Sequence, residues 1–176
     1  MLIHRYEVPE RFVAGTVGEP GDRTFFLQAR EGIRLTSVAL EKEQVLVLAE
    51  RIDNILERTD DEAASATVDI TDTEPLDQPI EEEFRVGTMT LAWDEAGEVV
   101  VLEAFAATDT EDEEATEALV VHLSRPMASA FASRAQRVIS AGREPCQFCG
   151  QPLSPAGHLC PRANGYKRIP PGPDGR

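Results

Sequence analysis

Two pairs of segments in this chain resemble each other and constrain how it can fold. The segment FVAGTV at residues 12–17 is similar to FRVGTM at 84–89, and FFLQA at 25–29 is similar to VVLEA at 100–104. Similarity that recurs along a chain is the signature of repeated structural units, which bury their hydrophobic faces against each other. We therefore expect two related units that share one core.

The distance between the two copies grows along the chain, and one insertion accounts for the growth. The copies are 72 residues apart at the first pair of segments and 75 apart at the second. Leu40 and Leu123, which each end an apolar run before a helical pattern, are 83 apart. The acidic block near 108–117 is long enough to hold the eight extra residues. These offsets predict an internal duplication with a loop insertion in the second copy.

Each half of the chain has the pattern of three strands followed by a helix. Short β-favouring runs are separated by turns rich in glycine, proline and aspartate, and apolar residues then recur at helical spacing. We expect the strands at 12–17, 23–30, 33–40, 84–93, 98–107 and 118–123, and the helices at 41–58 and about 125–141. The expected class is α+β: two tandem βββα repeats, which are antiparallel sheets with helices on one face, plus a short C-terminal zinc-knuckle-like segment.

Acidic residues gather in two segments, which changes the meaning of the net charge of −15. Residues 59–83 carry ten Asp or Glu and no Lys or Arg, and 108–117 carry six more, again unopposed. The rest of the chain has sixteen acidic and seventeen basic residues, and 125–176 hold eight bases against two acids. The charge therefore describes two solvated segments, and it does not exclude a partner that binds the basic end.

Composition shifts define the expected organisation of the chain. Acidic residues and few large apolar ones predict a mobile linker between the repeats, and Pro and Gly predict a disordered end. The expected parts are a first repeat at 1–58, an acidic linker at 59–83, a second repeat at 84–143 with its acidic insertion near 108–117, a zinc knuckle and basic tail at 144–168, and a disordered tail at 169–176.

All three cysteines of the chain lie within fifteen residues, in the pattern C-x2-C-x8-H-x-C. Two cysteines separated by two residues can both direct sulfur at one ion if the chain turns tightly, and the glycine that follows them permits such a turn. A histidine and a third cysteine complete a set of four N and S donors, which suits tetrahedral Zn²⁺. The predicted ligands of a structural zinc ion are Cys146, Cys149, His158 and Cys160.

Three other interpretations of these cysteines stay open. The CxxC pair could be a redox couple, although it follows a helix and the usual redox setting is a strand-to-helix junction. The thiols could be free and without a role, or one could form a catalytic pair with the histidine. Clustered cysteines without a disulfide framework indicate a reducing cytoplasm. His4 and His122 are expected to stand alone.

Basic and aromatic residues follow the last predicted ligand: Arg162, Tyr166, Lys167 and Arg168. Such a group could bind phosphate and stack on a base, which makes a nucleic-acid or nucleotide binder one alternative function. The simpler reading is a solvated basic tail that covers the zinc loop or offsets the acidic segments.

Four stretches together carry a resemblance to a known family. They are PERFVAGTVGEPGDRTFFLQA at 9–29, LEKEQ at 40–44, AGREPCQFCG at 141–150 and GHLCPRANGYKR at 157–168. The chain resembles an uncharacterised conserved family of high-GC Gram-positive bacteria, catalogued as a domain of unknown function. The resemblance spans nearly the whole chain outside the acidic linker. It implies a cytoplasmic bacterial protein and supplies no activity.

The sequence as a whole favours a non-catalytic binding or adaptor protein whose partner is another protein. It contains a core of ordinary size and no assembled catalytic motif. A second alternative is an enzyme with a polar cleft between the repeats. No apolar run approaches the roughly 20 residues that cross a bilayer, and the first residues are too polar for a signal peptide, so we expect no membrane partner.

Overall fold

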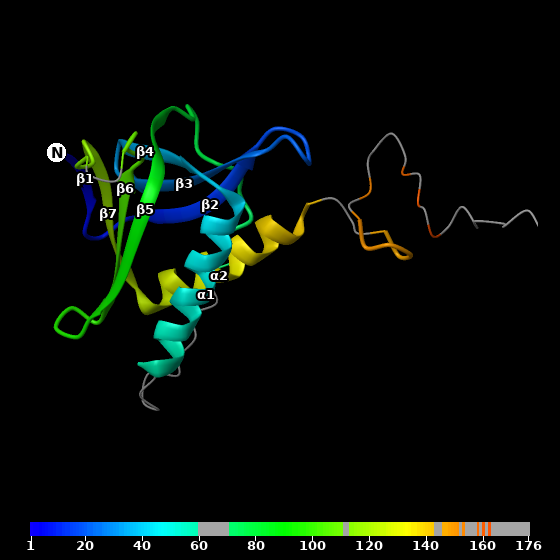
Figure 1. The fold of residues 1–176 in the computed structure, drawn as a ribbon. Helices are drawn as coiled ribbons and strands as arrows, with labels where there is room; N and C mark the ends of the chain where they lie inside the picture. The colour runs from blue at the N-terminus through cyan, green and yellow to red at the C-terminus, as the bar shows by residue number, and fades with distance from the viewer. Residues whose placement is uncertain are drawn as a thin grey trace, which may run out of the picture. The chain divides into compact units, whose positions relative to one another are not determined.

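The computed structural model describes residues 1–59, 71–110, 113–142, 146–151, 153, 158, 160 and 162. The chain forms two compact units, Met1–Ser140 and Ala141–Arg176. The described part of the first unit is a mixed α+β structure with a seven-stranded sheet and two helices (Figure 1). Its elements are β1 (Leu2–Tyr6), β2 (Arg11–Val17), β3 (Thr24–Glu31), β4 (Arg34–Leu40), α1 (Lys42–Arg58), β5 (Glu82–Asp94), β6 (Val99–Ala106), β7 (Glu117–Ser124) and α2 (Arg125–Ser140).

The strands and helices expected from the sequence are present, and β1 is an addition that the sequence did not predict. Its residues, LIHRY, lack a clear alternation of apolar and polar side chains. They form a strand because they pair in parallel with β7, from Leu2 opposite Glu117 to Tyr6 opposite Val121. The pairing satisfies the backbone groups of β7, which would otherwise be the edge of the sheet.

The two halves form one sheet rather than two antiparallel ones, in the order β1-β7-β6-β5-β4-β3-β2. Each half contributes a three-stranded antiparallel meander, and the two meanders join where β4 and β5 pair in parallel. A parallel connection needs a crossover, which α1 provides between these strands. The expected antiparallel pairing therefore holds within each meander, while the two meanders join through their edge strands in a parallel pair and make a single mixed sheet.

The strand register matches one part of the predicted internal similarity and departs from another. Phe25 pairs with Leu40, and the corresponding residues Val100 and Leu123 also pair. In the preceding hairpins, Ala29 pairs with Phe12, whereas Ala104 pairs with Met89 and not with Phe84. The β5–β6 hairpin therefore differs from the β2–β3 hairpin in its register and in the length of its strands.

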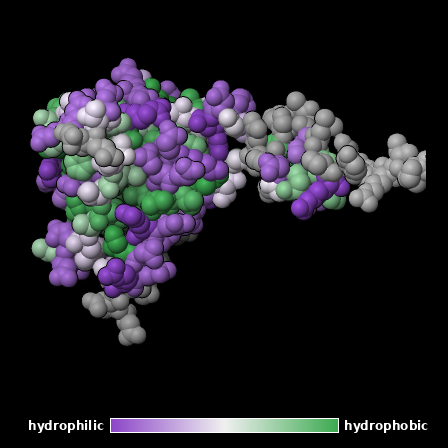
Figure 2. All heavy atoms as spheres, viewed as in Figure 1, coloured by the Kyte–Doolittle hydropathy of each residue, from purple (hydrophilic) through white to green (hydrophobic). Residues whose placement is uncertain are grey.

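One hydrophobic core joins both halves, because both helices lie on the same face of the sheet (Figure 1). The ring of Phe12 on β2 stacks on Phe131 of α2, with their centroids 4.8 Å apart, so a strand of the first half is covered by a helix of the second. Polar residues dominate much of the outer surface in Figure 2. The buried apolar residues of the helices are Val45, Leu48, Ala49, Ile52, Ala128, Phe131, Ala132 and Ala135.

The opposite face of the sheet is covered in part by residues 71–81, which we call the strap. Leu76 of the strap is buried against Val13, Phe26 and Ala39. It fits because Gly15 has no side chain: a Cβ at that position would lie 2.6 Å from Leu76. These residues belong to the stretch 59–83 that the sequence predicted to be an acidic, mobile linker. Most of residues 71–81 are exposed, but Leu76 is buried, and Asp72 and Asp77 are paired with Arg11. Residues 60–70 lie outside the described residues.

Charged and amide side chains hold the strap against the sheet. Arg11 donates to both carboxylate oxygens of Asp72, at 2.6 and 3.0 Å, and Arg134 donates to the same carboxylate at 2.7 Å. The buried side chain of Gln28 accepts from the backbone N–H of Asp77 at 2.7 Å and donates to its carbonyl at 3.0 Å. Acidic residues here are therefore structural, since their basic partners come from β2 and α2.

Gly15→Ala tests the contact between the strap and β2. We expect it to lower the free energy of unfolding by about 1–3 kcal/mol because the new methyl group crowds Leu76, and Leu76→Ala to cost about 2–5 kcal/mol. In the double variant the cost of Gly15→Ala should largely disappear, since the smaller side chain at 76 leaves room. Urea denaturation of the four proteins measures this. An equal cost of Gly15→Ala in both backgrounds would show that the contact is not the cause.

Asp72→Asn tests the ion pairs of the strap through pH. A hydrogen bond from Arg11, with the charges of Arg11 and Arg134, lowers the pKa of Asp72 below its usual value. The carboxylate therefore stabilises the fold above about pH 4, and this contribution is lost as pH falls through the lower pKa of the folded state. Asp72→Asn should reduce stability at pH 7 and flatten the loss of stability below about pH 4.

Thermal unfolding followed by circular dichroism from pH 7 to pH 2 measures this effect. Asp109→Asn, at an exposed position in the β6–β7 connection, is the control and should keep the wild-type profile. The ion-pair argument is refuted if Asp72→Asn loses as much stability below about pH 4 as the wild type does.

Candidate metal centre

A tight turn in the second unit brings Cys146 and Cys149 together. The backbone N–H of Gly150 donates to the carbonyl oxygen of Cys146 at 2.8 Å, and the N–H of Cys146 donates to the carbonyl of Gln151 at 2.8 Å. Gly150 has a φ of 73°, in the left-handed region that residues with a Cβ rarely adopt. The glycine after the second cysteine thus serves the turn that the sequence predicted.

The four predicted ligands converge. One donor atom from each of Cys146, Cys149, His158 and Cys160 lies within 4.8 Å of the other three. His158 Nε2 is 3.1 Å from Cys149 Sγ. Ligands at the usual Zn–S and Zn–N bond lengths are separated by roughly 3.5–3.8 Å in a tetrahedron, so these four donors fit around one ion with small shifts. The set of three sulfurs and one imidazole is typical of closed zinc sites.

The turn also affects the protonation of the thiols. Hydrogen bonds from the backbone amides of Phe148 and Cys149 lower the pKa of Cys146 to about 6. At Cys149 a hydrogen bond from the Gln151 amide lowers the pKa, but burial and the neighbouring sulfurs of Cys160 and Cys146 outweigh it, and the net shift is upward. The turn therefore presents one sulfur readily as the thiolate, the form that binds metal.

The basic residues after the cluster are only partly described. Arg162 donates from Nη1 to the carbonyl oxygen of Phe148, at 3.4 Å. Its side chain thus folds back onto the cysteine turn. Tyr166, Lys167 and Arg168 lie outside the described residues, so the predicted phosphate-binding group remains a prediction.

The first unit contains a second group of side chains that can bind a metal ion, which the sequence did not predict. His4 was expected to stand alone, but its imidazole and the carboxylates of Glu83 and Glu117 place one donor atom each within 4.8 Å of the others. His4 and Glu117 are 113 residues apart in the chain. No local pattern could reveal this group, because its residues come from three strands, β1, β5 and β7, that only the folded sheet brings together.

A hollow of about 310 Å³ between α1 and β5 lies where an enzyme with a cleft between the halves would need one. It is lined by residues of α1 between 43 and 51 and by residues 89–91 of β5. Two of its polar side chains already have partners: Gln44 donates to the carbonyls of Val86 and Gly87, and Thr90 donates to Glu103. Glu43 and Arg51 also line the hollow, and the enzyme alternative stays a prediction.

Within the described residues, no helix has the length and apolar character needed to cross a membrane.

Comparison with known proteins assigns a family and no activity. A search of curated proteins and a search of solved structures each find no match. The family model described as "Protein of unknown function (DUF3090)" matches residues 4–160. This span runs from β1 to the fourth donor, Cys160, and so includes the sheet unit and the cysteine cluster. The resemblance to a conserved family of unknown function is thereby confirmed, while the bacterial lineage stays a prediction. The chain belongs to the DUF3090 family.

Proposed function

We propose that Cys146, Cys149, His158 and Cys160 bind one structural Zn²⁺, and that the protein is a non-catalytic binding or adaptor protein whose zinc module contacts another protein. The convergence of the four donors within 4.8 Å carries this proposal. Four protein ligands fill a tetrahedral shell and leave no position for a reacting water. The ion therefore orders the segment and supplies no chemistry. Thiolates must stay reduced to bind it, so the proposal includes a cytoplasmic location.

An exposed aromatic residue on the cysteine turn supports a protein partner. Phe148 lies between the two cysteines and is 62% exposed. A metal-fixed turn holds such a ring with little loss of entropy on binding, and aromatic residues are enriched at the centres of protein interfaces. The side chain thus has the chemistry and position of an anchor that inserts into a pocket of the partner.

The internal duplication is part of the same proposal for the first unit. It is supported by the element order, since β2-β3-β4-α1 and β5-β6-β7-α2 follow each other. The matching pairs Phe25 with Leu40 and Val100 with Leu123 support it further. The differing register of the β5–β6 hairpin is then a change that arose in the second copy. A duplicated body with one shared core would serve as the scaffold that carries the zinc module.

Elemental analysis of full-length protein, purified without chelator, tests the metal. We expect about one zinc per chain in the wild type and less than about a tenth of that in Cys149→Ser, because three ligands hold structural zinc far less tightly than four. His158→Ala should also lose zinc, whereas His122→Ala, which changes a histidine on β7, should retain it. Zinc near zero in the wild type would refute the metal centre, and the free-thiol reading would then stand.

Phe148→Ala tests the adaptor function separately from the metal. The tagged wild type should capture a partner protein from lysate of its source organism, and the variant should lose that partner while it keeps one zinc per chain. Ile33→Ala, at a fully exposed apolar position in the first unit, is the matched control and should capture as the wild type does. Capture that nuclease abolishes would contradict the protein partner and favour nucleic-acid binding through Arg162 and its neighbours.

A further inference from the structure

A histidine and two glutamates from three strands meet at one end of the sheet in the first unit. His4 lies on β1, Glu83 near the start of β5, and Glu117 at the start of β7. In the parallel register Leu2 lies opposite Glu117 and His4 lies opposite Leu119. His4 and Glu117 are thus diagonal neighbours, and His4 Nε2 lies 3.1 Å from a carboxylate oxygen of Glu117.

The third residue makes this more than an ion pair. A carboxylate oxygen of Glu83 lies within 4.8 Å of both other donors. Neither Glu83 nor Glu117 is paired with an arginine or lysine among the residues that the structure describes. Two carboxylates that converge beside a single imidazole carry more negative charge than that imidazole can balance, even when it is protonated. A divalent cation between them would balance both.

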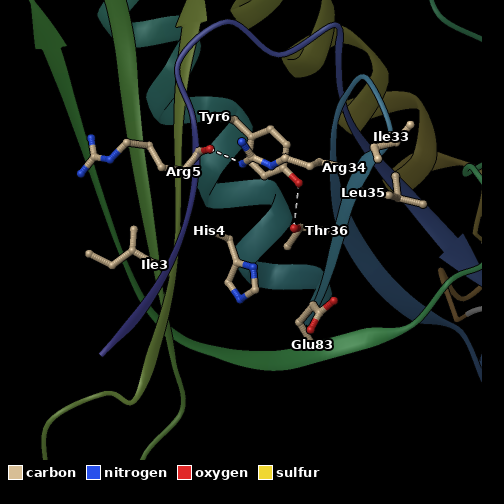
Figure 3. Close-up of a pocket in the computed structure, with 9 residues that line it drawn as sticks. All are labelled: Ile3, His4, Arg5, Tyr6, Ile33, Arg34, Leu35, Thr36 and Glu83. Atoms are coloured by element: carbon tan, nitrogen blue, oxygen red, sulfur yellow. Dashed lines mark hydrogen bonds between the residues drawn. The ribbon is translucent and has the colours of Figure 1, made fainter.

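The cluster borders a polar hollow of about 560 Å³ (Figure 3). His4 and Glu83 lie at one end of it, while residues of β1 and β4 form its walls. The walls are fixed to each other, because Tyr6 and Thr36 share a hydrogen bond of 2.8 Å between their hydroxyl groups. Arg34 stacks over the Tyr6 ring at 4.5 Å and donates to the carbonyl of Arg5. Of the three donors, His4 lies on a braced strand, so this bracing holds its imidazole in place before an ion arrives.

We propose that His4, Glu83 and Glu117 bind one divalent first-row transition cation, with its remaining coordination positions open to the hollow. One imidazole and two carboxylates suit Mn²⁺, Fe²⁺ or Zn²⁺, whereas thiolates select Zn²⁺. Three protein ligands leave positions for water or for a small anionic ligand. This site differs from the cysteine centre in its donors, in its open shell and in the unit that contains it.

Titration of full-length protein with Mn²⁺, followed by the loss of the free-ion signal in electron paramagnetic resonance, tests the site. Mn²⁺ is the probe because its preference for oxygen and nitrogen donors separates this site from the cysteines. We expect about one Mn²⁺ per chain, and His4→Ala, Glu83→Gln and Glu117→Gln should each weaken binding by about tenfold or more. Glu50→Gln, an exposed glutamate on α1, is the matched control and should bind as the wild type does.

The cysteine centre is tested in parallel, so that the two proposals fail separately. Cys149→Ser should lose zinc and keep its Mn²⁺ binding. Glu83 is exposed, so Glu83→Gln should keep the fold. It therefore tests the site even if His4→Ala or Glu117→Gln unfolds the protein, which a lower far-ultraviolet circular dichroism signal would reveal. If the wild type binds no Mn²⁺ up to millimolar concentration, or if Glu83→Gln and Glu50→Gln bind it equally, the three residues form only a histidine–glutamate ion pair and the inference is overturned.

Discussion

The parallel pairing of β4 with β5 makes one sheet of two meanders, and it is also the sparsest pairing in the sheet. It has two register positions, Ser37 opposite Glu82 and Ala39 opposite Arg85, with an irregularity between them. The start of α1 strengthens this seam. Gln44 accepts from the backbone N–H of Glu41, which caps the helix, and donates to two carbonyls of β5. Arg85 donates to Glu41 at 2.9 Å. The capping of α1 and the joining of the halves therefore depend on the same side chains.

How far the sequence could predict this structure follows from the range of each interaction. Hydrophobic periodicity reflects contacts with a local face, so it located α1 and most of the strands. The cysteine turn was predictable for the same reason, since four donors within fifteen residues need only one turn. The strap was not, because a stretch such as 71–81 looks solvated unless Arg11 and Arg134 are known to lie beside it. β1 and the His4 cluster depend on a partner strand more than a hundred residues away.

The charge distribution also shows that local sequence patterns do not reveal distant partners. Both acidic stretches were read as solvated, yet Asp72 and Asp77 bind arginines of the sheet and α2, and Glu117 binds His4. A buried or half-buried carboxylate costs desolvation energy unless it is paired and hydrogen-bonded. In the strap, hydrogen bonds from both Arg11 and Arg134 to the Asp72 carboxylate offset this desolvation energy. Local charge density therefore identified which segments are acidic, but not which of their residues have structural partners.

The two proposed metal sites differ in what must form before an ion can bind. The cysteine centre has its four donors within residues 146–160, so the ion and the turn can order each other during folding. The His4 cluster exists only once β1 has paired with β7 and β5 has joined the sheet, so its donors are an outcome of folding. An ion there adds stability only in proportion to its affinity and concentration. A closed thiolate shell then suits permanent occupancy, and the open carboxylate site suits exchange with the ions and small ligands in its surroundings.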